Sequence, residues 1–223
     1  MVTGLRKSGA STASATAFFL GNPALNPAVL VFLLLALGWQ WAALRAVLGI
    51  VLVFGTASIV ARIAPGNLLE MHKVHEAQED KTAPEKDEGS LSVRWLKALF
   101  RLTITLAPAY VIMILLLGAV RAYLFPAAGP QLGNSLLVII GLALAGTIFA
   151  IPTAAEIPII SAMRGFGVGA GPAGALLLTL APVSAPSLVL VASVFPKRVL
   201  AVIGLSVFVV GIVAGILAIA LGL

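Results

Sequence analysis

Long apolar stretches, separated by single charged residues or by short polar segments, dominate the chain. No charged residue occurs from Ser8 to Leu44, Ala46 to Ala61, Leu102 to Val120, Ala122 to Ala155, Gly165 to Pro196 or Val199 to Leu223. A helix needs roughly 20 apolar residues to cross the hydrocarbon core of a bilayer, and several of these stretches reach that length. The pattern therefore predicts an all-α, polytopic integral membrane protein.

The apolar residues divide into six segments, which we place at 10–38, 42–63, 99–123, 134–152, 153–195 and 198–222. The fifth segment is composite, because several prolines interrupt it. Residues 64–98 differ from the rest, because they carry seven of the eight acidic residues and cannot bury a core. We interpret them as a polar cytoplasmic linker between a first membrane unit, 1–63, and a second, 99–223, since flanking Lys and Arg favour the cytoplasmic side.

Composition removes several classes of function. Hydrophobic residues make up 61% and charged residues 10% of the chain, whereas soluble domains are about a quarter charged. The formal charge of +6 comes from residues at the ends of apolar segments and forms no basic, aromatic patch of the kind that binds nucleic acid. Cysteine is absent, and both histidines lie in the linker. No catalytic or nucleotide-binding motif is present either, so we expect no enzyme activity, cofactor, metal or nucleic-acid partner.

Two stretches of the chain resemble each other. The first, "LRKSGASTASATAFFLGNPALNP", begins at Leu5, and the second, "MRGFGVGAGPAGALLLTLAPVSAP", begins at Met163. Each has an arginine, a glycine three residues later and a P-x-x-x-P pair that follows the arginine after 17 or 18 residues. We expect an internal repeat in which each copy has a proline-broken helix, at 21–27 and within 153–195. Convergence of low-complexity membrane sequence is the alternative.

The prolines predict where a solute binds. A proline lacks an N–H and frees the carbonyl four residues earlier, so Pro27 should free the carbonyl of Pro23. Such groups cannot face lipid, and matched broken helices in two repeats indicate a transporter's binding site. The predicted substrate-binding residues are Asn22, Pro23, Asn26, Pro27, Thr179, Pro182, Ser184 and Pro186. The alternative is that the prolines only bend helices for packing.

Glu156 is the only carboxylate outside the polar linker. Charged groups inside membrane segments are costly and usually mark function. Because desolvation favours the neutral form of a carboxyl group, we expect Glu156 to bind a coupling proton or a cationic group of the solute. The alternative is an interfacial glutamate that pairs with a lipid headgroup or with Arg164. Trp39, Trp41 and Trp95 fit the role of interfacial anchors.

The stretches "LRKSGASTASATAFFLGNPALNPAVLVFLLLALGW" and "TAAEIPIISAMRGFGVGAGPAGALLLTLAPVSAPSLVLV" resemble the signature regions of the predicted permeases related to YraQ and to the organoarsenical efflux permeases. The resemblance implies a multi-pass permease of the cell inner membrane, with several relatives linked to export of arsenic compounds. Relatives usually carry further helices and a cysteine-bearing stretch before the first arginine, where this chain has only Val2, Thr3 and Gly4 after Met1.

We therefore expect a membrane permease that moves a small solute or ion, by ion-gradient-coupled efflux. Its partners are the lipid bilayer and the solute, with a homo-oligomer or a partner membrane chain as further possibilities. The alternative is a truncated or non-transporting membrane subunit that needs a partner chain to complete the transporter.

Overall fold

The computed structural model describes residues 9–64, 100, 133–149, 151 and 154–223. Nearly all of the polar linker and of the apolar segment at 99–123 lies outside these residues, as does Trp95. Within them, every regular element is an α-helix. The helices are α2 (Thr12–Ala24), α3 (Pro27–Leu37), α4 (Trp39–Ile63), α7 (Leu136–Ile148), α8 (Glu156–Gly165), α9 (Ala170–Thr179), α10 (Ala185–Val191) and α11 (Lys197–Ala220).

The first apolar segment contains a helix boundary at Pro27, whereas Pro23 lies inside α2, in its last turn. α2 ends at Ala24, and α3 begins at Pro27, which has no N–H to continue the helical hydrogen bonds of α2. Asn26 caps α3, because its side-chain Oδ1 accepts a hydrogen bond from the N–H of Ala28. The boundary lies within the predicted range 21–27 and near the middle of the 26-residue apolar stretch Thr12–Leu37.

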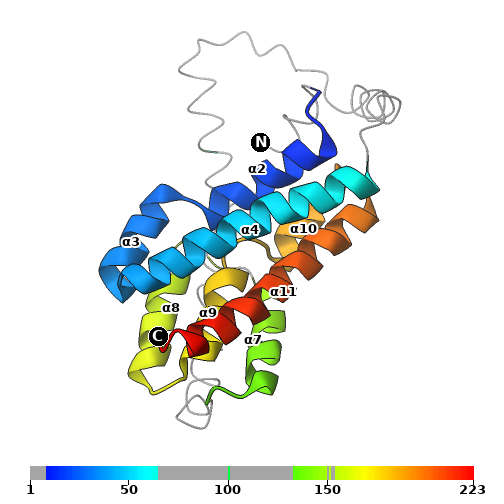
Figure 1. Ribbon diagram of the computed structural model, residues 1–223. Coiled ribbons are helices and arrows are strands. Elements are labelled where there is room, and N and C mark those ends of the chain that lie inside the picture. The colour runs from blue at the N-terminus through cyan, green and yellow to red at the C-terminus, as the bar shows by residue number, and fades with distance from the viewer. Residues whose placement is uncertain (1–8, 65–99, 101–132, 150, 152–153) are drawn as a thin grey trace.

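A one-residue turn joins α3 to α4. Gly38 has φ 98 and ψ 170, a backbone conformation that favours glycine. α4 consequently begins at Trp39, three residues before the expected start of the segment 42–63. Both α2 and α3 pack along α4, so these three helices form one layer of the molecule (Figure 1).

The expected composite segment at 153–195 contains three separate short helices, α8, α9 and α10. A glycine-rich turn with Gly167 at φ 83 joins α8 to α9. α9 ends at Thr179, and α10 begins after Ser184, whose side chain forms a capping box with Ser187. The expected segments 134–152 and 198–222 correspond to α7 and α11.

The two longest helices lie side by side and run in opposite directions (Figure 1). The amino-terminal half of α4, through Leu44 and Leu48, shares an apolar cluster with Ala214 and Ala218 near the end of α11. The carboxyl-terminal half of α4 shares a second cluster with the beginning of α11; its members include Leu52, Val53, Val60, Val199, Ile203 and Val207. Because the start of α4 packs against the end of α11 and the end of α4 against the start of α11, the two helices are antiparallel.

Small residues let α9 and α11 approach closely. A Cβ atom added to Gly174 of α9 would lie 2.7 Å from the carbonyl oxygen of Ala214 and 2.7 Å from the Cβ of Ala218. Gly211 of α11 faces Thr179 in the same way. Such interfaces are typical of helices packed in membranes, where van der Waals contact replaces the hydrophobic effect between helices.

Three stretches among the described residues are long and apolar enough to cross a membrane: Thr12–Leu37, Trp39–Ile63 and Lys197–Ala220. α7 and α9 are apolar but shorter, with 13 and 10 residues. A helix of 10 residues is about 15 Å long, half of a hydrocarbon core. The short helices are therefore too short to cross a hydrocarbon core on their own.

Candidate functional site

A buried ion pair joins α4 to α8. Nη1 of Arg45, on α4, lies 2.6 Å from Oε1 of Glu156, the first residue of α8. Arg45 is 1% exposed and Glu156 is 0% exposed. Both charges are therefore withdrawn from water and from lipid, which is costly unless each finds a partner.

Arg45 also occupies the carbonyl end of α2. Its Nη2 donates to the carbonyl oxygen of Pro23 at 2.9 Å, and its Nε donates to that of Ala24 at 3.3 Å. The last carbonyls of a helix lack partners within the helix, and Pro27 cannot supply an N–H to Pro23. The carbonyl of Pro23 therefore has no N–H partner within its helix, as the sequence predicted, and it accepts a hydrogen bond from the guanidinium group instead.

Helix ends favour both charges of the pair. The carbonyl end of a helix carries partial negative charge and the amino end partial positive charge. Arg45 lies at the carbonyl end of α2, and Glu156 lies at the amino end of α8. The pair therefore bridges two helix ends of opposite polarity, in addition to its own attraction.

Glu156 begins α8, and only one of its two carboxylate oxygens has a hydrogen-bond partner among the described residues. Ala154, two residues before it, has φ 69, a left-handed conformation that is rare for alanine. Oε2 of Glu156 is buried and has no hydrogen-bond partner among the described residues. One oxygen of this buried carboxylate can thus still accept a hydrogen bond.

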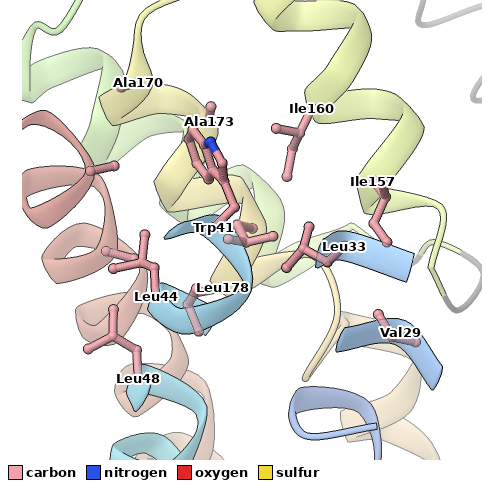
Figure 2. Packing of buried hydrophobic residues seen from close by; sticks show 13 residues of the cluster. Val29, Leu33, Trp41, Leu44, Leu48, Ile157, Ile160, Ala170, Ala173 and Leu178 are labelled. Carbon is pink, nitrogen blue, oxygen red and sulfur yellow. The ribbon is translucent and has the colours of Figure 1, made fainter. Parts of the chain in front are cut away.

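An apolar cluster encloses this site on one side. Figure 2 shows Leu33 of α3, Trp41 of α4, Ile157 of α8 and Leu178 of α9 converging in one group. Gly49 of α4 brings the end of α2 close to that helix, because an added Cβ would lie 2.7 Å from Leu25 and 3.5 Å from the carbonyl oxygen of Ala24. The charged groups of Arg45 and Glu156 are therefore shielded from the surface of the described structure.

Comparison with known proteins identifies the family. The family model described as "ArsP_1: Predicted permease" matches residues 1–219. The chain belongs to this family of predicted permeases. It is 40% identical to UPF0718 protein YraQ of Escherichia coli (strain K12) over 222 residues, which cover 98% of the chain and 61% of that relative. The resemblance seen in the sequence is thereby confirmed.

A second relative is more distant. UPF0718 protein MJ0584 of Methanocaldococcus jannaschii is 33% identical over 129 residues, which cover 55% of the chain and 35% of that relative. The chain thus spans about three fifths of the bacterial relative and about a third of the archaeal one. The chain has no match among solved structures. Membership of this family agrees with the three helical stretches that are long and apolar enough to cross a membrane.

The residues predicted for the first unit lie around the end of α2. The backbone of Pro23 contacts the ion pair, whereas the side chain of Asn26 caps α3. Asn22 and Pro27 are exposed on the described surface. Only Pro23 of these four therefore touches Arg45.

The residues predicted in the second unit lie at the end of α9 and the start of α10. Thr179 is buried, and its hydroxyl donates to the carbonyl of Ala175 in its own helix. Pro182 is buried in the turn, Ser184 caps α10, and Pro186 is exposed. The two helix boundaries border one apolar cluster, since it contains Ala24 and Val183 and Leu25 packs against it. No hydrogen bond between the described residues joins these second-unit side chains to Arg45 or Glu156.

Arg45 is the residue that motif reasoning missed. Its sequence signal was its position, because it is the only charged residue between Ser8 and Ala61. Glu156 pairs with this arginine rather than with Arg164, whose guanidinium carbon lies 5.3 Å from the ring centre of Trp41. Trp41 itself is buried, so the prediction of an interfacial anchor fits exposed Trp39 but not Trp41.

Proposed function

We propose that the chain is a multi-pass permease of the cell inner membrane that moves a small solute or ion by alternating access, with the Arg45–Glu156 pair at its binding site. The observation that carries the proposal is this fully buried pair, held against the open carbonyl end of α2. A buried ion pair is weak evidence for stability, because apolar residues of similar volume often stabilise a protein as well or better. Its presence therefore supports a role in transport.

Transporters bind substrate and coupling ions near the bilayer midplane, where helices are interrupted and helix ends meet charges. The boundary between α2 and α3 lies near the middle of the stretch Thr12–Leu37, and we propose that it is one of two such interruptions, the other lying between α9 and α10. An internal repeat with inverted orientation would account for both. The polar groups of Asn22, Asn26, Thr179 and Ser184 line the path of the solute in this proposal.

Glu156 is the proposed coupling residue. A carboxyl group that alternates between ion pair and neutral acid couples solute movement to a proton gradient without ATP. Efflux is the direction that the family resemblance favours, and it remains a prediction.

The test is flux through the purified chain in proteoliposomes, across a panel of anionic, cationic and neutral solutes, with and without a pH gradient. We expect flux of at least one solute class, and we expect Arg45→Met and Glu156→Gln to abolish it or its coupling. Arg62→Gln is the matched control, because Arg62 is the other arginine of α4 and is exposed. If folded Arg45→Met and Glu156→Gln proteins transport as the wild type does, the pair is not the site.

A further inference from the structure

We propose that the Arg45–Glu156 site binds a small monovalent oxyanion together with one proton, so that anion and proton move in the same direction. This inference rests on the proposed function and names the class of its solute. Three observations carry it: the full burial of both charges, the carbonyl anchors of Arg45, and the unpartnered Oε2 of Glu156.

The two members of the pair differ in what they can do with their charge. An arginine side chain keeps its positive charge in proteins, whereas a glutamate can become neutral by binding a proton. The buried site can therefore change its charge in only one way, by protonation of Glu156. The unpartnered Oε2 is the oxygen that can take this proton without breaking an existing hydrogen bond.

Protonation leaves a buried cation without a counter-charge. A single buried charge is far more costly than a pair. Once Glu156 is neutral, binding of one negative charge beside Arg45 therefore becomes favourable. No other carboxylate in the described residues can supply this charge, because Glu156 is the only one outside the linker. An incoming anion of charge −1 restores neutrality.

The geometry around Arg45 favours an oxyanion of carboxylate size. A guanidinium group has five N–H donors, and its bonds to the described residues use three atoms: Nε and Nη2 on carbonyls, and Nη1 on the carboxylate. The carbonyl bonds can hold the guanidinium in place while the carboxylate leaves. A planar oxyanion can then take the position that Oε1 occupied, since the guanidinium fork matches carboxylate-like oxygens.

A cationic solute fits the site poorly. A cation at the unpartnered Oε2 would share a single carboxylate with Arg45 and leave the buried site with a net charge of +1, which is costly. No other charged group on the surrounding described elements neutralises this charge. α3 and α9 carry none, Arg62 is exposed on α4, and Arg164 is exposed at the far end of α8. Co-binding of proton and anion therefore implies symport rather than exchange.

The experiment measures binding and proton uptake on the purified full chain in detergent. Nitrate, formate and acetate are titrated by calorimetry in two buffers of different ionisation enthalpy, which gives the number of protons taken up per anion. For at least one anion we expect one proton per anion, and an affinity that falls about tenfold per pH unit on the alkaline side.

Two variants separate the roles of the pair. Glu156→Gln carries the neutral form permanently, so we expect it to bind the same anion without proton uptake and without pH dependence. Arg45→Met should bind no anion, and Arg62→Gln should match the wild type. Circular dichroism and gel filtration confirm that each variant is folded.

The inference is overturned if none of the three anions binds to the wild type, or if folded Glu156→Gln binds the anion with the same proton uptake. Binding of tetramethylammonium with proton release would also overturn it. The proposed function survives these outcomes if flux of another solute still depends on Arg45 and Glu156. If flux depends on neither residue, the proposed function fails as well.

Discussion

At the residue scale, Arg45 and Glu156 can both be buried because each neutralises the charge of the other. Each is the lone charge in a long apolar region, and each would be costly to bury alone. Together they form a neutral pair between the end of α2 and the start of α8. Because 111 residues separate them in sequence, the pair ties α4 to the distant helix α8.

Breaking the pair should destabilise the protein more than removing it. We expect Arg45→Met or Glu156→Leu alone to cost about 3–5 kcal/mol, because each leaves an uncompensated buried charge. The double variant should recover much of this loss. Thermal unfolding in detergent is measured for the wild type, the two single variants and the double variant. A loss of stability in the double variant equal to the sum of the two single losses would show that the side chains do not interact.

The residue-scale prediction from sequence was half complete. Glu156 stood out because it was the only carboxylate outside the linker, and the freed carbonyl of Pro23 followed from the chemistry of Pro27. Arg45 did not stand out, because it lies near the start of the apolar segment 42–63 and basic residues near segment ends were interpreted together as helix anchors. Pairing across 111 residues depends on tertiary packing, which the spacing of apolar residues does not specify.

At the element scale, side chains and glycines decide where helices end and meet. The prolines predicted the boundary between α2 and α3, and the capping side chains of Asn26 and Ser184 define where the next helices begin. The division of 153–195 into three short helices was not predicted in detail. Apolar residues occupy both its helices and its turns, so periodicity could not place their ends.

Asn26 tests capping against solute binding. Asn26→Ala removes the side-chain oxygen that accepts from Ala28, and we expect a loss of about 1 kcal/mol. Asn26→Ser keeps a capping oxygen and should retain most of the stability. If the serine variant unfolds normally but loses transport as fully as the alanine variant, then the amide contacts solute.

Gly174 tests the close contact between α9 and α11. Gly174→Ala places a methyl group against the backbone of Ala214, so we expect a lower unfolding temperature and separation of the two helices. Gly141→Ala on α7 is the control, because nothing lies within 4 Å of its added Cβ. The control should be neutral or stabilising by up to about 1 kcal/mol; equal effects of both substitutions would contradict the packing argument.

At the scale of the whole molecule, the antiparallel packing of α4 and α11 has a consequence for topology. Both helices are long enough to cross the membrane, so their first residues should lie on opposite faces. This orientation is what an inverted repeat requires, and the order of apolar segments alone could not distinguish it from a parallel repeat. The overall class and the family were predictable from sequence, because charge-free length and signature residues are local properties.

The absence of native cysteine makes this topology directly testable. Trp39→Cys and Arg198→Cys place single thiols at exposed positions at the starts of α4 and α11. In sealed vesicles of one orientation, we expect a membrane-impermeant maleimide to label one variant before lysis and the other only after lysis. Labelling of both from the same side would rule out opposite orientation of these helices.

The central claim is that proton and solute meet at the buried pair, and proton flux tests it most directly. Proteoliposomes with a trapped pH dye receive an inward gradient of an anion that binds the purified chain. The account predicts acidification of the lumen by the wild type and by Arg62→Gln, and none by folded Arg45→Met. Acidification by Arg45→Met at the wild-type rate would contradict it.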